Sequence, residues 1–124
     1  MKICDLSLKE KILQTVVLRH TNDRFVSDKV GAVFFGGEII TEADDMGLDK
    51  AKRILARYID NADIPLLITS DFENGCGGMV KGLTTMPYLS GLGASNNVQL
   101  AYDYGKATAL EARSIGANWS FSPV

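Results

Sequence analysis

The sequence predicts an α/β fold built on a parallel sheet, and two observations lead to this prediction. Short, continuously apolar runs rich in β-branched and aromatic residues recur along the chain, as expected of strands that are buried on both faces. Stretches with apolar residues at helical spacing separate these runs. Because parallel strands need long crossover connections, usually helices, the alternation favours a parallel sheet over hairpins.

The first predicted helix begins after Ser7. Glu10 follows three residues later, which is the spacing of a capping box, where each residue's side chain bonds to the other's free amide. Apolar residues then recur at helical spacing: Leu8, Ile12, Leu13, Val16 and Val17. His20, the only histidine, follows near the end of this predicted helix. We interpret it as a cation that complements the helix dipole, with a catalytic base as the alternative.

Two strands and a second helix come next. "VGAVFFGG", residues 30–37, is too short for a buried helix and is bounded by glycines, so it predicts a strand. A second amphipathic helix ends at Asn61 and Asp63, before Pro65. Its apolar face comprises Leu48, Ala51, Ile54, Leu55, Tyr58 and Ile59. "IPLLIT", residues 64–69, is the second predicted strand.

The last third of the chain begins with a long loop. Residues 70–87 show no periodicity, and loops of that length in compact domains are usually functional or disordered. A third helix is predicted from about Asn97 to Ile115, closed by Gly116. Its apolar face comprises Leu100, Ala101, Tyr104, Ala107, Thr108 and Ile115. "ANWSFSPV", residues 117–124, is the third predicted strand.

Two architectures fit this order of elements: an open doubly wound sheet and a (β/α)8 barrel. A barrel needs ~250 residues, so three strands within 124 residues supply only part of one. Three parallel strands alone would leave both sheet edges unpaired. The chain is therefore either a small open sheet or a fragment of a larger domain, and the unpaired edges favour the fragment.

Composition and charge exclude several classes of protein. The 13 basic and 15 acidic residues are scattered, so the basic patch of a nucleic-acid-binding protein is absent. No stretch approaches the roughly 18 apolar residues of a membrane span, and the N-terminus becomes charged too soon for a secretion signal, so we expect a cytoplasmic protein. Cys4 and Cys76 lie far apart and form no CxxC motif. We interpret them as buried or idle thiols and predict no metal and no other cofactor.

The candidate site is the loop "SDFENGCGG", residues 70–78, because parallel sheets bind ligands at the carboxyl ends of their strands. Asp71 follows the second predicted strand directly, and an ionised carboxylate accepts hydrogen bonds from hydroxyl groups. Glu73 would point to the same side in an extended chain. The catalytic acid pair of a retaining glycosidase, however, needs carboxyls ~5 to 5.5 Å apart that flank one bond, whereas these neighbours would approach a substrate from one side.

Other interpretations of the chain's polar and aromatic residues stay open. The acids of the loop could form a solvated turn without a ligand. "GCGGMVKG" lacks the GxxxxGK[ST] spacing of a phosphate loop, which disfavours nucleotide binding. Trp119, the only tryptophan, could stack on a sugar, although a tryptophan in a buried strand is more often part of the core.

The stretches "IPLLITSDFENG" and "TTMPYLSGLGASNNVQLAYDYGKATALEARSIGANWSFSPV" resemble the N-terminal barrel domain of glycoside hydrolase family 3. "LSLKEKILQ" and "VGAVFFGG" are also similar to the family's first helix and first strand, so the resemblance covers nearly the whole chain. The matching residues are Asp71, Glu73, Pro87, Leu92-Gly93-Ala94, Gly105, Glu111-Ala112-Arg113, Gly116 and residues 118–124.

The resemblance implies that residues 1–124 are the first three β/α units of a single (β/α)8-type barrel domain, incomplete in this chain. It also implies an enzyme that removes β-linked glucose, xylose, N-acetylglucosamine or related units with retention of configuration. The resemblance further implies that Asp71 binds hydroxyls of the terminal sugar. We expect Glu73 to be a second contact that organises the loop. The family's nucleophile, and its arginine and Lys-His pair, would follow Val124. This segment would then need the remainder of the barrel as a partner and would be inactive alone.

Alternatives stay open for the substrate specificity and for the class of protein. The loop has no arginine where the N-acetylglucosaminidase branch has Glu-Gly-Gly-Arg, so a β-glucosidase-like specificity is an alternative to a β-N-acetylhexosaminidase-like one. The competing class is a non-catalytic α/β module that binds sugar or acts in signalling. A signalling receiver would need clustered acids after its first strand, where "VFFGGE" offers only Glu38.

Overall fold

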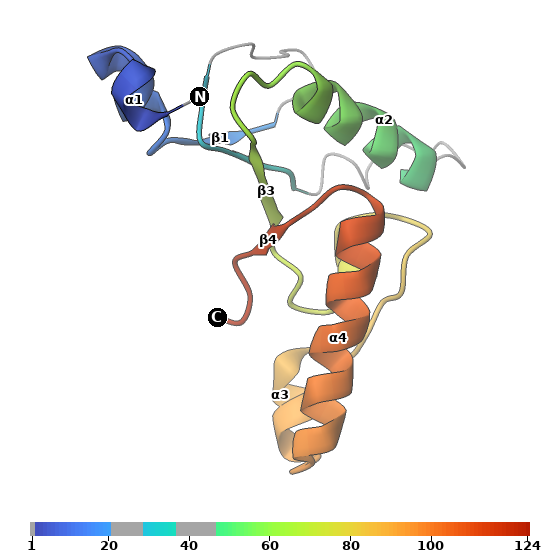
Figure 1. Ribbon diagram of the computed structural model, residues 1–124. Coiled ribbons are helices and arrows are strands. Elements are labelled where there is room, and N and C mark those ends of the chain that lie inside the picture. Colours follow the sequence, from blue (N-terminus) through green and yellow to red (C-terminus); the bar gives the residue numbers. More distant parts are fainter. Residues whose placement is uncertain (1, 21–28, 37–46) are drawn as a thin grey trace.

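The computed structural model describes residues 2–20, 29–36 and 47–124 (Figure 1). Gly37 and Glu38, on which two of the sequence interpretations depend, lie outside these residues. The elements, in chain order, are η1 (Ile3–Asp5), α1 (Leu8–Leu13), β1 (Val17–Arg19), β2 (Ala32–Phe34), α2 (Gly47–Asp60), β3 (Leu67–Ser70), η3 (Cys76–Gly78), α3 (Leu89–Ala94), α4 (Val98–Ser114) and β4 (Trp119–Ser120).

The strands form one parallel sheet in the order β1-β2-β3-β4, which confirms the predicted α/β class with parallel pairing. Asn118 fixes β4 beside β3: its side-chain amide donates to the Leu66 carbonyl at 3.1 Å and its Oδ1 accepts from the Ile68 amide at 2.8 Å. The side chain of Asn118 thus supplements the two short strands' backbone ladder at the end of the sheet.

The first predicted helix is wrong at its C-terminal end. The capping box is present, with the Ser7 amide 2.7 Å from Glu10 Oε2, but α1 ends at Leu13 and Val17 begins β1. Thr15, Val16 and Val17 are β-branched, and such residues fit a strand better than a helix. The Ala32 amide donates to the Val16 carbonyl, so pairing with the β2 segment decides the outcome. The described residues therefore contain four strands, where the sequence predicted three.

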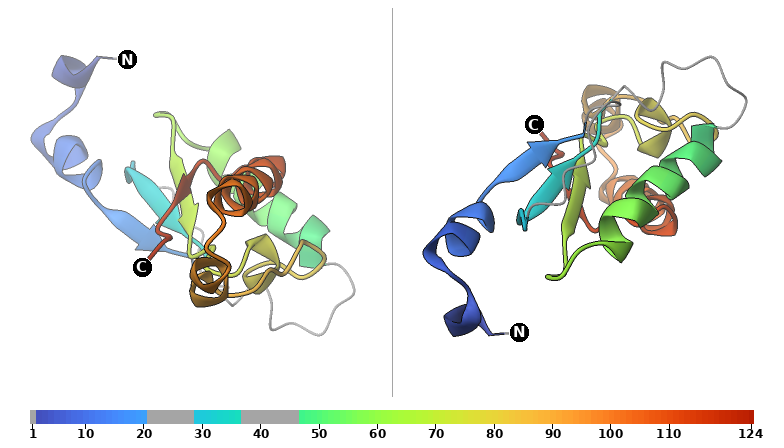
Figure 2. Two further views of the ribbon diagram at one scale, coloured as in Figure 1. Left: turned by 90° about the horizontal axis from the view of Figure 1, so that it is seen from below. Right: turned by 90° about the horizontal axis from the view of Figure 1, so that it is seen from above.

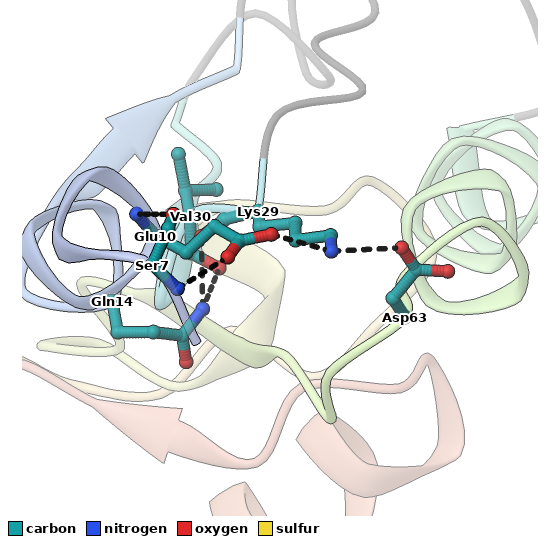
Figure 3. Close-up of polar contacts among 6 residues, drawn as sticks. All are labelled: Ser7, Glu10, Gln14, Lys29, Val30 and Asp63. Carbon is teal, nitrogen blue, oxygen red and sulfur yellow. Dashed lines mark hydrogen bonds and ion pairs between the residues drawn. The ribbon is translucent and has the colours of Figure 1, made fainter. Parts of the chain in front are cut away.

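A glycine permits the close approach of α1 to the sheet. The Gly31 amide donates to the Leu13 carbonyl at 3.0 Å, and a Cβ on Gly31 would collide with the carbonyl oxygen of Gln14. The side-chain amide of Gln14 adds a hydrogen bond to the Lys29 carbonyl at 2.8 Å. Lys29 Nζ lies 2.7 Å from Glu10 Oε1 and 3.6 Å from Asp63 Oδ2, so it bridges α1 to the end of the α2 segment (Figure 3).

The other predicted elements are present close to their expected bounds. α2, β3, α4 and β4 lie within a few residues of the predicted helices and strands. Asn97 caps α4 by accepting from the Leu100 amide at 3.1 Å, and Gly116 closes it with φ +96°, a conformation that favours glycine. No sequence pattern predicted α3, because Gly91 and Gly93 weaken helix propensity within its six residues.

The hydrophobic core lies between the sheet and helices α2 and α4, which Figure 2 shows on the same side of the strands. The sheet and its extensions contribute Val33, Phe35, Ile68 and Phe72. Helix α2 contributes Ala51, Leu55 and Tyr58, and α4 contributes Ala112, with Ile115 directly after its end. Among the described residues, no helix combines the length and the apolar character that crossing a membrane requires. The α2–α4 side of the sheet is therefore the packed side.

Candidate functional site

The sheet face that points away from α2 and α4 has a distinct set of side chains. Arg19 pairs with Phe34, Phe34 with Thr69, and Thr69 with Trp119, so these residues form one row across the four strands. Residues that pair directly across parallel strands share a face, and their neighbours Val33 and Ile68 belong to the core on the other face. The row therefore faces away from the helices.

Aromatic rings cover much of this row. Phe34 stacks on Phe121 with centroids 5.6 Å apart, and Phe121 meets Trp119 edge-on at 4.9 Å. The guanidinium carbon of Arg19 lies 5.8 Å from the Phe34 ring centroid. Trp119 is 42% exposed, so the interpretation of this tryptophan as a core residue is wrong. The face thus presents ring surface to solvent.

Asp71 directly follows β3 at the edge of this face. Ser70 and Phe72, the residues on either side of it, are buried on the helix side, where Ser70 Oγ donates to the Phe35 carbonyl. Alternation along an extended segment then directs Asp71, which is partly exposed, to the opposite side. The Phe121 amide donates to the Ser70 carbonyl at 3.1 Å, so the backbone beside Asp71 is paired with the aromatic segment.

Glu73 is held by backbone contacts at the loop. Its Oε1 accepts from the Val124 amide at 3.2 Å, and its carbonyl accepts from the Tyr104 hydroxyl at 2.9 Å. These contacts are those of a residue that organises the loop. A direct contact of Glu73 or Asp71 with a sugar stays a prediction.

The loop between β3 and α3 is ordered by its own backbone. The Gly77 amide donates to the Thr84 carbonyl at 2.9 Å and the Met86 amide to the Asn74 carbonyl at 2.7 Å. These bonds pair the two halves of residues 74–86 around η3. A loop of this length was expected to be either functional or disordered. The expectation of a disordered loop is therefore wrong.

A pocket of about 490 Å³ lies on the helix side of the sheet. Its lining includes Leu89 and Leu92 of α3, Tyr104 and Arg113 of α4, and Trp119 of β4. Most of these residues belong to helices on the α2–α4 side of the sheet, whereas Asp71 points to the opposite side. Trp119 borders both the pocket and the aromatic face, because β4 is an edge strand in the described residues.

His20 occupies a different place from the one predicted. It follows β1 instead of a helix, it is buried, and its Nδ1 lies 2.9 Å from the Tyr58 hydroxyl of α2. The interpretation as a helix-terminal charge is therefore wrong, because the preceding segment is a strand. Burial raises the pKa of the Tyr58 hydroxyl, which keeps it protonated at neutral pH.

The two cysteines differ in environment. Cys4 is exposed, whereas Cys76 is fully buried and its Sγ lies 3.3 Å from the Thr108 carbonyl. Burial raises the pKa of the Cys76 thiol to about 12, so it is almost entirely protonated at neutral pH and is a poor nucleophile. Within the described ranges, no group of three or more histidine, cysteine, aspartate or glutamate side chains could hold a metal ion.

A comparison with known families assigns the chain. The family described as "Glycosyl hydrolase family 3 N terminal domain" matches residues 7–124. The chain belongs to glycosyl hydrolase family 3. No curated protein matches the sequence. Membership confirms the resemblance found in the sequence and places the chain in a family of enzymes that hydrolyse glycosidic bonds, with carbohydrates as substrates.

Within this family 3 chain, sequence reasoning predicted Asp71 and Glu73 as site residues and did not predict the residues that the structure places around them. Phe34 joins the face through strand register and Phe121 through stacking on Phe34, and neither residue carries a signal of its own. Tyr104 was placed on the apolar side of its helix, and Glu111 appeared only as part of the "EAR" motif. Tyr104 and Glu111 could have been found from their spacing, since residues 104 and 111 are two helical turns apart on one side of α4.

Proposed function

We propose that residues 1–124 form the N-terminal part of a single family 3 glycoside hydrolase barrel and supply one wall of its sugar site. The strand order supports a barrel: β1 to β4 follow one another without reversal, and α2 and α4 cover the same face. A doubly wound sheet instead reverses its strand order and carries helices on both faces. In a barrel, the aromatic row would face the interior and Asp71 would stand at the catalytic rim.

The observation that carries the proposed sugar site is the position of Asp71 beside exposed rings on one sheet face. A pyranose offers hydroxyl groups at its edges and apolar C–H groups on its faces. An ionised Asp71 accepts hydrogen bonds from the hydroxyls, and the rings of Trp119 and Phe121 provide apolar surface for the C–H groups. Both kinds of contact come from neighbouring strand ends, as parallel architectures require of a ligand site.

The chemistry that this wall supports is binding, and bond cleavage needs groups that it lacks. Retaining hydrolysis uses a nucleophile and an acid/base on opposite flanks of the glycosidic bond. Asp71 and Glu73 approach from one side, and the Glu73 carboxylate is engaged with the Val124 amide. We therefore assign Asp71 to ground-state and transition-state binding of the terminal sugar, and assign the nucleophile to a later strand of the barrel.

The substrate class is a β-linked glucoside or N-acetylglucosaminide. The residues after Glu73 are Asn74, Gly75 and Cys76, without an arginine that could bind an acetamido group. This composition favours a β-glucosidase-like specificity over a β-N-acetylhexosaminidase-like one.

The test uses chromogenic β-glucosides and β-N-acetylglucosaminides. The longest protein that the coding sequence encodes is expected to release the chromophore, and residues 1–124 alone are expected to release none above a blank. Asp71→Ala is expected to lower kcat/KM by roughly 10- to 100-fold, the loss for a hydrogen bond to a charged group, because sugar hydroxyls lose their acceptor. Lys81→Ala, an exposed change in the same loop, serves as control. Turnover by residues 1–124, or unchanged kcat/KM in Asp71→Ala, would contradict the proposal.

A further inference from the structure

One side of α4 contacts the loop that follows Asp71 at several points. The Tyr104 hydroxyl lies 2.9 Å from the Glu73 carbonyl oxygen and 3.0 Å from that of Pro87. Its single proton is thus shared between two acceptors that lie 14 residues apart in the chain. One side chain therefore ties together the beginning and the end of the loop.

Glu111, two turns further along α4, holds the middle of the same loop. Its Oε2 accepts from the Thr84 amide at 3.0 Å, and its Oε1 accepts from the Thr84 hydroxyl at 2.5 Å. Bonds to an ionised carboxylate are stronger than bonds between neutral groups, and two bonds from one residue fix its orientation. Glu111 therefore fastens Thr84 to the helix, and the Gly77–Thr84 backbone bond extends this restraint to η3.

A third contact lies between these two. Cys76 Sγ donates to the carbonyl of Thr108, and the Thr108 hydroxyl in turn donates to the carbonyl of Tyr104. Residues 104, 108 and 111 follow the i, i+4, i+7 spacing of one helix face. This face of α4, hereafter the brace, therefore contacts the loop at Glu73, Cys76, Thr84 and Pro87.

The brace acts on Asp71 through short chain distances. Ser70, one residue before Asp71, is fixed to the Phe35 carbonyl, and Glu73, two residues after it, is fixed to Tyr104. Asp71 thus has an anchored residue on each side. A binding carboxylate that is held in place before the sugar arrives loses less conformational entropy on binding, and small displacements of such groups lower the rate strongly.

We propose that Tyr104 and Glu111 are positioning residues, which hold residues 71–88 so that Asp71 is presented to the sugar. This inference rests on the proposed function, because it needs Asp71 to bind substrate. Neither residue touches the sugar. The brace acts on activity only through the loop, so its effect on activity requires Asp71. A general contribution to the stability of the fold would affect activity whether or not Asp71 is present.

The physical part of the proposal is tested by hydrogen–deuterium exchange in the longest protein that the coding sequence encodes. Tyr104→Phe and Glu111→Gln are expected to speed exchange across residues 73–87 about fivefold, the factor for one hydrogen bond of ~1 kcal/mol. Tyr102→Phe and Asp103→Asn are matched controls, because both residues are exposed on the same helix, and they are expected to leave the loop unchanged. Unchanged exchange in Tyr104→Phe and Glu111→Gln would overturn the brace.

The functional part is tested by a double-mutant cycle in the longest protein that the coding sequence encodes. Tyr104→Phe is expected to lower kcat/KM about fivefold in the wild-type background and to have no further effect in Asp71→Ala. Glu111→Gln, which keeps one acceptor oxygen, is expected to lose less than Glu111→Ala. Equal losses in both backgrounds would overturn the positioning role. If instead Asp71→Ala alone leaves kcat/KM unchanged, the proposed function fails, and the exchange results still decide whether the brace exists.

Discussion

The N-terminal arm, residues 2–16, and the site loop, residues 71–88, are attached to the sheet in opposite ways. The arm contributes no buried residue from α1, and Leu8 and Ile12 are mostly exposed. Its links are the partly buried Leu13, which packs against the core, the hydrogen bonds at Gln14 and Gly31, and the ion pair of Glu10 with Lys29 (Figure 3). The site loop instead buries Phe72, Cys76 and Val80 completely or nearly so.

The difference shows what each attachment can do. Buried apolar groups and hydrogen bonds in a low dielectric are costly to break, so they hold a segment in one geometry. Exposed ion pairs contribute little and are screened by salt. The role proposed for the site loop, to position a ligand-binding carboxylate, needs the first kind of attachment, and the site loop has it.

The rates at which the two cysteines react with a thiol reagent are expected to differ most between the two regions, each of which contains one cysteine. Cys76 has a pKa of about 12, so at pH 8 only about one thiol in 10⁴ is ionised. An aromatic disulfide reagent is expected to label Cys4 within minutes and Cys76 only after unfolding, since burial also blocks access. Absorbance of the released thiolate measures both rates. Cys4→Ser should remove the fast phase and Cys76→Ser the slow one; two fast phases in the native protein would show that the site loop opens readily.

Truncation of one apolar side chain in each region gives the next largest contrast. Phe72→Ala is expected to lower the free energy of unfolding by about 3 to 5 kcal/mol, because Phe72 is buried against Phe35. Leu8→Ala, at a residue 75% exposed, is expected to change it by less than ~0.5 kcal/mol. Urea unfolding followed by circular dichroism measures both. Comparable losses would mean that the arm buries its apolar face in solution.

Local signals explain what could be predicted from the sequence. The Ser7–Glu10 capping box and the closure of α4 by Gly116 depend on neighbours in the chain, so both were found. β1 was missed because Val16 and Val17 satisfy helical spacing as well as strand propensity, and pairing with the β2 segment makes the choice. The position of Asp71 at the end of a strand could be predicted from the apolar run that precedes it. The Glu111–Thr84 contact joins residues 27 apart, and no local pattern reports it.

The smallest expected effect concerns the ion pair of the arm. Bonds from Lys29 and then Ser7 lower the pKa of Glu10 from 4.5 to about 2. A carboxyl whose pKa is lower in the folded state stabilises that state above its ordinary pKa, and the contribution is lost as the pH falls from 4.5 towards 2. The difference in unfolding free energy between wild type and Glu10→Gln is therefore expected to be present at pH 7 and to vanish near pH 2.

Urea unfolding at several pH values measures this difference, and subtracting the Glu10→Gln curve removes the titration of the other acids. Because Glu10 is at the surface, salt should reduce the difference at pH 7, whereas salt should leave the loss caused by Phe72→Ala almost unchanged. Asp49→Asn, at an exposed acid in the first turn of α2, serves as a charge-matched control. A difference that persists at pH 2 would show that the contribution of Glu10 comes from packing of its side chain and not from its charge, which would make the attachment of the arm resemble that of the site loop.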